Sequence, residues 1–252
     1  MGALRPGSDE EIRVIAEEPM AYLRQAERRC APLDQYRVTF HRQERLGLIP
    51  RLAELERMDA VYRARPLSVK FTWLDADSEY REALYVEGQH EDKVCLLPRN
   101  GMFGLPPVVS RFRPEDAMAF GKARNSIKDF GVHRMLVRTL KRINDARSLG
   151  DVSLKYVGRR DLESIDVYHF EARYPQRDPY PNKRQDLFFE VARGLPVGTM
   201  LWLPSDELDA LYFYLNLTTP SAPFGDDVFT ISGPAQAGER RRDGLPRISR
   251  HA

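Results

Sequence analysis

Apolar and polar positions alternate with a period of two over much of this chain. The first clear run places Tyr36, Val38 and Phe40 on one face and polar residues between them on the other. A period of two is typical of a strand with one buried side. Further runs predict strands at Leu67–Trp73, Glu82–Gly88, Lys93–Pro98, Val152–Val157, Ile165–Tyr174, Gln185–Val191, Val197–Leu203 and Leu208–Leu217.

The segment Arg51–Arg63 gives conflicting signals. Its composition favours a helix, but it follows the first strand and is bounded by Pro50 and Pro66. We interpret it as the return strand of a hairpin.

Two segments have helical periodicity instead. The first spans residues 8–30, where Ser8 and Glu11 form a capping box and Pro19 is expected to kink or divide the helix. The second is predicted at Ser126–Arg147. Its apolar stripe consists of Phe130, Val132, Leu136, Leu140 and Ile143.

These elements predict an α+β, β-rich fold. About ten short strands joined mostly by short turns should pair antiparallel, and a twisted sheet of this kind coils. Its inner face needs an apolar cover, for which the two helices are available. We therefore expect one domain over residues 1–232, built as a curved antiparallel sheet, or incomplete β-barrel, wrapped around or closed by two helices.

Composition narrows the set of partners. The net charge is +2, and residues 239–252 contain five arginines against two acids, so the rest of the chain is near neutral. This balance gives no support for a nucleic-acid partner. Residues 233–252 are predicted to form a disordered basic tail, in which Arg240, Arg241 and Arg242 are either simply solvated or weakly attracted to anionic lipid headgroups. No segment has the roughly 18 apolar residues of a membrane span.

Reactive groups are sparse. Cys30 and Cys95 are interpreted as two free, buried thiols rather than one bridge. No hydrolase, zinc-protease, P-loop or dinucleotide motif is present, so we predict no catalytic residue, metal ligand or cofactor. The run His90–Asp92 suits a solvated turn, and His133 with Asp129 suits an ion pair on a helix surface.

The large side chains on the strand faces are the strongest functional candidates. Glu44 and Arg45 suit cross-strand charge pairing better than contact with a ligand headgroup. Aromatic side chains in a coiled sheet either form an ordinary core or line a cavity for a lipid chain. The candidate cavity residues are Val38, Phe40, Val69, Phe71, Trp73, Phe170, Leu211 and Phe213.

Several short motifs resemble one family when they are taken in order. They are Tyr36-x-x-x-Phe40-x-x-x-Glu44-Arg45, Pro66-x-x-x-Lys70 with Trp73, Leu84-Tyr85-Val86-Glu87-Gly88, Arg124-Asn125-Ser126-Ile127 with Gly131, and Gly194-Leu195-Pro196-Val197 before the aromatic strand Tyr212–Leu217. Together they resemble a bacterial domain-of-unknown-function family, number 1571, related in fold to the LolA and LolB lipoprotein carriers. The resemblance covers Leu33–Phe229.

The resemblance implies a LolA-like half-open barrel exported to the bacterial envelope. The expected function is then a non-enzymatic carrier or binding protein of the periplasm or cell envelope. Its partner would be a lipid or lipoprotein acyl chain, with an envelope protein as a further partner. Export implies a native signal sequence that precedes the residues given, whereas a native start at Met1 implies a cytoplasmic protein. Two alternatives remain: an enzyme with Glu44 or His41 as acid or base, and an interaction module without a cavity ligand.

Overall fold

The structure is a computed structural model that describes residues 6–101, 105–119 and 121–232. The predicted tail at 233–252, with Arg240, Arg241 and Arg242, lies outside the described residues.

Twelve strands form one antiparallel sheet, in the order β7-β6-β5-β4-β3-β1-β12-β11-β10-β9-β8, with β2 paired to β1. β7 and β8 lie at the two ends of the strand order and do not pair with each other in the described part of the chain, so the barrel is incomplete, as predicted. The bounds are β1 (Gln35–Leu46), β2 (Arg51–Leu52), β3 (Glu56–Arg63), β4 (Ser68–Trp73), β5 (Tyr80–Val86), β6 (Val94–Pro98), β7 (Ser110–Phe112), β8 (Ser153–Leu162), β9 (Ile165–Arg173), β10 (Arg184–Glu190), β11 (Pro196–Trp202) and β12 (Leu208–Thr218).

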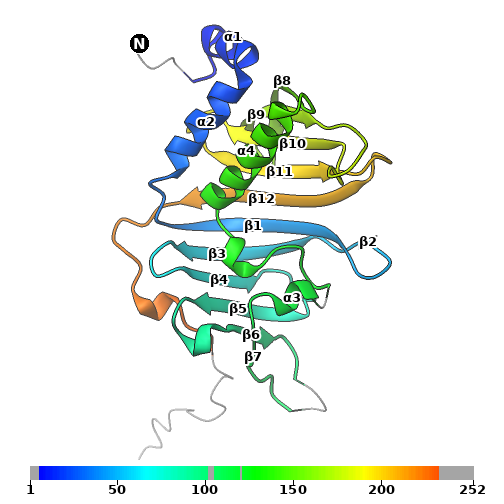
Figure 1. Cartoon of the computed structure of the whole chain (residues 1–252). Helices are drawn as coiled ribbons and strands as arrows, with labels where there is room; N and C mark the ends of the chain where they lie inside the picture. Colours follow the sequence, from blue (N-terminus) through cyan, green and yellow to red (C-terminus); the bar gives the residue numbers. More distant parts are fainter. Residues whose placement is uncertain (1–5, 102–104, 120, 233–252) are drawn as a thin grey trace, which may run out of the picture.

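The centre of the sheet joins two halves that are distant in sequence. β1 pairs with β3 on one side and with β12 on the other (Figure 1). Phe40 faces Met58 and Val38 faces Ala60 in the β1–β3 register, so the return strand that we predicted at Arg51–Arg63 forms over Glu56–Arg63. Strand pairing here outweighs the local helix propensity because it buries the apolar side of the segment.

The helices follow the sequence signals with one correction. α1 (Asp9–Glu17) is capped by Ser8, and α2 (Pro19–Cys30) begins at Pro19, which divides the predicted helix in two. The second long helix, α4 (Val132–Ser148), starts later than predicted, after a separate 3-10 turn, η2 (Ile127–Asp129). The shorter helices are α3 (Asp116–Ala119), η1 (His90–Asp92) and η3 (Asp226–Val228).

Gly131 explains the late start of α4. Its φ of 134° is open mainly to glycine, and a Cβ there would lie 3.2 Å from the Tyr62 ring. The Tyr36 hydroxyl accepts a hydrogen bond from the Val132 backbone N–H at 3.0 Å and so caps the helix from the sheet.

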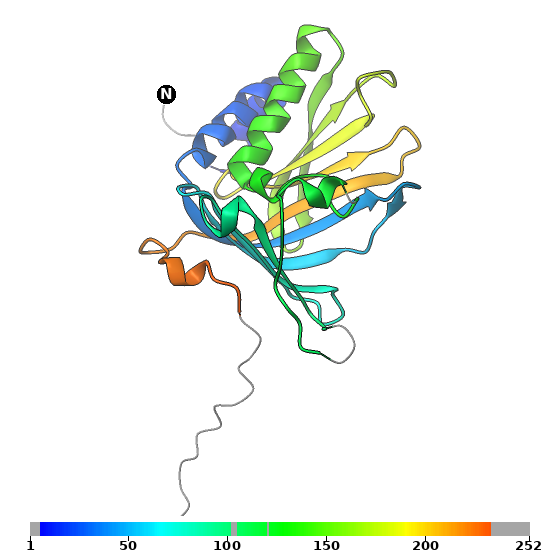
Figure 2. The same cartoon turned by 60° about the horizontal axis from the view of Figure 1, so that its bottom comes forward.

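The helices α1, α2 and α4 lie over one face of the curved sheet, which we call the inner face (Figure 2). α2 and α4 are linked by His133 Nε2 and Glu27 Oε1 at 2.6 Å. The predicted pair of His133 with Asp129 is therefore wrong, because Asp129 is 3.4 Å from Arg138 instead. None of the helices in the described ranges has the length and apolar character needed to cross a bilayer.

The opposite, outer face is also covered with apolar side chains. Residues 224–231 pack against β3, β5 and β6. Asp226 pairs with Arg63 at 2.8 Å, and the Arg63 guanidinium lies 4.5 Å from the centroid of the Phe229 ring. Cys95 is buried in this outer cluster, whereas Cys30 is buried beneath the helices, and both thiols are free, as predicted. Burial raises the pKa of the Cys30 thiol to about 12, with a further contribution from Glu27.

Candidate functional site

A cavity of about 1430 Å³ lies between the inner face of the sheet, α4 and the segment that precedes α4. Strands β1 to β7 and β10 to β12 contribute to its walls. Sites for drug-sized ligands are roughly 300–1,000 Å³. This cavity therefore has room for a ligand longer than an ordinary small metabolite.

One wall of the cavity is aromatic. The Phe130 ring, just before α4, lies 4.9 Å from the Phe71 ring and 5.0 Å from the Phe40 ring, between centroids. Trp73 and Tyr214 extend this wall along β4 and β12. Such rings provide a large apolar contact area in a defined geometry.

The structure separates the eight predicted cavity residues into three groups. Phe40, Phe71 and Trp73 line the cavity, and Val38 and Val69 belong to the same inner core cluster behind them. Phe170 is packed under α2, where its ring stacks on Tyr22 at 5.3 Å. Leu211 and Phe213 lie on the outer face with Phe188.

Tyr212 and Tyr214 line the cavity from β12 in place of Leu211 and Phe213. The two pairs alternate along β12. The sequence pattern therefore identified the strand correctly but not which of its faces points into the cavity. Alternation along the predicted strand Leu208–Leu217 would place Leu211, Phe213, Leu215 and Leu217 on one face, but this face breaks at the end of the strand. Asn216 has a φ of 55°, and Leu217 joins the inner cluster.

The other wall of the cavity is polar and begins at Glu44, which is 2% exposed. Its carboxylate accepts hydrogen bonds from the Tyr212 hydroxyl at 2.5 Å and from the Arg124 backbone N–H at 3.2 Å. Burial and the Glu44 charge raise the pKa of Tyr212 well above its ordinary value, so its hydroxyl stays protonated and donates. The Arg124 guanidinium in turn pairs with Asp209 at 2.6 Å.

A second cluster of charged residues lies beside Arg42, two residues before Glu44 on the same face of β1. Arg42 Nε donates to Glu56 Oε2 at 2.7 Å, and Trp73 Nε1 donates to Glu56 Oε1 at 2.9 Å. Burial acts to lower the pKa of Arg42, but Glu56 and Glu44 more than offset it and raise the pKa. Arg45 lies 3.8 Å from Glu207, whereas Glu44 is held by hydrogen bonds rather than by the cross-strand charge pairing that we predicted.

Two candidate acid–base residues of the enzyme hypothesis lie apart. Glu44 points into the cavity, but His41 is an odd-numbered β1 residue and faces the outer side, where burial lowers its pKa. They therefore do not converge on one substrate. Among the described residues, no group of three or more His, Cys, Asp or Glu side chains is arranged to hold a metal ion.

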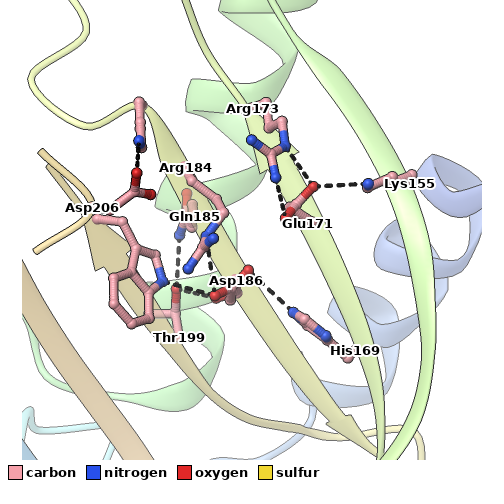
Figure 3. A network of polar contacts seen from close by, with 11 residues as sticks. Lys155, His169, Glu171, Arg173, Arg184, Gln185, Asp186, Thr199 and Asp206 are labelled. Carbon is pink, nitrogen blue, oxygen red and sulfur yellow. Dashed lines mark hydrogen bonds and ion pairs between the residues drawn. The ribbon is translucent and has the colours of Figure 1, made fainter. Parts of the chain in front are cut away.

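A polar network covers part of the outer face between β8 and β11 (Figure 3). Asp186 lies 3.1 Å from His169 Nε2 and accepts a hydrogen bond from Trp202 Nε1 at 2.7 Å, while Glu171 pairs with Arg173 at 2.7 Å. These residues alternate with inner-face residues such as Phe170. Glu171 also pairs with Lys155 of β8 at 3.1 Å, so opposite charges in this part of the network offset one another and stabilise the sheet.

Solved structures with similar folds include three bacterial proteins. MucB from Pseudomonas aeruginosa, in complex with MucA, has a TM-score of 0.47 at 13% identity, over 85% of this chain and 61% of that one. Lipoprotein LppX from Mycobacterium tuberculosis has 0.44 at 14% identity, over 85% and 99%. A LolA superfamily protein from Nitrosomonas europaea has 0.35 at 11% identity, over 84% and 96%. The chain thus spans less than two thirds of the MucB chain.

The sequence itself was compared in two further ways. No curated protein matches the chain. Residues 33–229 match the model of a family described as a protein of unknown function (DUF1571), which is the family that the sequence motifs resemble. Because the match spans most of the chain, this protein belongs to the DUF1571 family.

Proposed function

We propose that this protein is a non-enzymatic carrier or binding protein that holds a lipid-like ligand between its sheet and α4. The observation that supports this most directly is the cavity of about 1430 Å³ with its aromatic wall. A filled core would instead favour an interaction module without a ligand.

The energetics of an acyl chain are sufficient for useful affinity. Each methylene removed from water contributes about 0.8 kcal/mol, so about 15 methylenes contribute about 12 kcal/mol. Association costs of at least about 4 kcal/mol leave at most about 8 kcal/mol, which corresponds to a Kd of about 1 μM or weaker.

The polar wall supports binding without chemistry. Its acids already have partners: Glu44 accepts from Tyr212 and Arg124, and Glu56 accepts from Arg42 and Trp73. These hydrogen bonds occupy lone pairs of both carboxylates, so fewer are free to accept a proton from a substrate.

The wild type is expected to bind a fluorescent fatty-acid probe saturably, and Leu96→Glu to weaken that binding at least about 10-fold. Leu96 is a partly buried residue of β6 that lines the cavity. A ligand chain that covers a carboxylate at this position would strip its hydration, which costs binding free energy. The matched control is Val157→Glu on β8, where the side chain is 46% exposed and outside the cavity. Titration of probe fluorescence measures both effects.

Two results would contradict the carrier proposal. One is the absence of saturable probe binding by the folded wild type. The other is equal binding by Leu96→Glu and Val157→Glu, with circular dichroism showing that both variants are folded.

The proposal includes the envelope location implied by the sequence resemblance, with an envelope protein as a further possible partner. Fractionation of the native cells is expected to recover the protein outside the cytoplasm. Recovery in the cytosol would contradict this location and leave the cavity proposal standing.

A further inference from the structure

A second, smaller cavity of about 320 Å³ lies beside the large one. It is formed by the second half of α4 and by the residues between β9 and β10. Arg138 and Arg142 line both cavities, so the two spaces meet at α4.

Asn182 lines the small cavity, and its buried side-chain oxygen Oδ1 is a hydrogen-bond acceptor without a partner in the described part of the chain. The side chain is 3% exposed, and its Nδ2 donates to Asp209 Oδ2 at 2.7 Å. Because the carboxylate needs a donor, this bond fixes the orientation of the amide. The Oδ1 atom then has no hydrogen-bond partner among the described residues. A buried unpaired acceptor costs about 1–3 kcal/mol, so a donor from a ligand would be favoured there.

Tyr174 brings a second unpartnered group to the same cavity. Its ring stacks on Tyr180 at 5.4 Å, and its buried hydroxyl has no partner among the described residues. Burial raises the pKa of Tyr174 to about 12, although the nearby Arg142 charge opposes the shift. The hydroxyl is therefore protonated at neutral pH and available as a donor.

Three cations of α4 line the small cavity, and one of them has no acidic partner. Lys141 pairs with Asp145 at 2.6 Å, and Arg138 lies 3.4 Å from Asp129. Arg142 forms no ion pair within the described residues. Asp145 also lines this cavity but pairs with Lys141, so the five N–H donors of the Arg142 guanidinium remain suited to a phosphate or carboxylate.

The polar lining continues into the large cavity. Gln185, a buried residue of β10, donates from Nε2 to Thr199 Oγ1 at 3.0 Å (Figure 3). Its Oε1 has no partner among the described residues, and Thr139 of α4 lines the cavity beside it. Hydrogen-bonding groups thus extend from the small cavity toward the aromatic wall.

We infer that the small cavity receives the anionic headgroup of an amphiphile whose chain lies in the large cavity. Arg142 and Arg138 would bind the anionic group, Tyr174 would donate to it, and Asn182 Oδ1 would accept from a headgroup hydroxyl. This inference rests on the proposed function, and it specifies the ligand as a single-chain anionic lipid or the corresponding part of a larger one.

The test compares two lipids that differ only in a phosphate. The wild type is expected to bind 1-oleoylglycerol 3-phosphate at least about 10-fold more tightly than 1-oleoylglycerol, as measured by displacement of the fluorescent probe. Arg142→Gln should lower this ratio to less than about threefold. The control is Arg147→Gln, which removes the same charge from the exposed last turn of α4 and should keep the wild-type ratio.

Tyr174→Phe gives an independent test that does not alter charge. Because the hydroxyl has no partner in the protein, its removal should leave the Tm unchanged or slightly higher. Loss of one hydrogen bond to the headgroup should weaken binding of the phosphorylated lipid about three- to tenfold. An unchanged affinity would count against the assignment of Tyr174.

The outcomes separate the two proposals. If neither lipid binds, the proposed function fails. If both lipids bind the wild type equally, the headgroup inference is overturned while the carrier function stands. If glycerol 3-phosphate alone binds as tightly as the phosphorylated lipid, the small cavity is a site for a soluble anion, and the headgroup inference is likewise overturned.

Discussion

Replacing Phe170 with alanine is expected to lower the free energy of unfolding by about 4 kcal/mol. The side chain is fully buried between β9 and α2, stacked on Tyr22 at 5.3 Å and edge-on to Phe189 at 5.5 Å. Removal of a buried phenyl ring loses its transfer free energy and leaves a void, at a cost of about 3–5 kcal/mol. The aromatic contacts place this site above the lower end of that range. Urea denaturation followed by circular dichroism measures the change.

The same variant also tests where the ligand lies. Because Phe170 does not line the cavity, Phe170→Ala should bind the fatty-acid probe with an affinity within about twofold of wild type, at a temperature where it is folded. Val157→Ala on the exposed side of β8 is the stability control and should change unfolding by less than about 0.5 kcal/mol. A loss below about 1 kcal/mol for Phe170→Ala would contradict the packing. If the folded variant no longer binds the probe, Phe170 contributes to the binding site after all.

Replacing Glu44 with alanine is expected to lower the free energy of unfolding by about 3 kcal/mol. The change leaves the buried Tyr212 hydroxyl and the Arg124 backbone N–H without their acceptor. It also removes one of the two acids that offset the buried charge of Arg42. Removal of one member of a buried charged network costs about 3–5 kcal/mol, partly because its partners stay buried without compensation. We expect a loss of stability at the lower end of this range because Arg42 still pairs with Glu56 in the variant.

Two control variants define the origin of this loss. Glu44→Gln keeps an acceptor oxygen and should lose less stability than Glu44→Ala. Glu54→Ala removes an exposed acid at the mouth of the same cavity and should stay within about 0.5 kcal/mol of wild type. If Glu44→Ala unfolds at the same urea concentration as Glu54→Ala, the buried network does not hold the Arg124 segment against β1 and β12.

Local pattern was enough to identify most strands and their antiparallel pairing. The run Ile165–Tyr174, for example, predicts one face of Tyr168, Phe170, Ala172 and Tyr174, and all four lie in a single inner cluster. The strand period and the short turns are properties of neighbouring residues, so they can be read without knowledge of the rest of the chain. The short strand β7 was missed because three residues carry too little pattern, and the break between β2 and β3 inside Arg51–Arg63 was not predicted.

Contacts between distant segments decided what the pattern left open. The segment Glu56–Arg63 is a strand because it pairs with β1, and α4 begins at Val132 because Tyr36 and Gly131 meet there. The inward side of β12 was also undetermined, since Leu211 and Phe213 alternate with Tyr212 and Tyr214 and both sets are apolar.

The sequence alone thus determined that this protein is a curved antiparallel sheet with helices on it, and which residues share a face along most of the strands. The tertiary structure alone decided which face looks into the cavity, how β1 and β12 join the two halves, and that Arg142, Tyr174 and Asn182 meet at one small cavity. The physical reason is that both faces of the sheet are covered, by the helices on the inner side and by residues 224–231 on part of the outer side. Alternation marks the two sides of a strand, but only packing against another segment determines which side is inside.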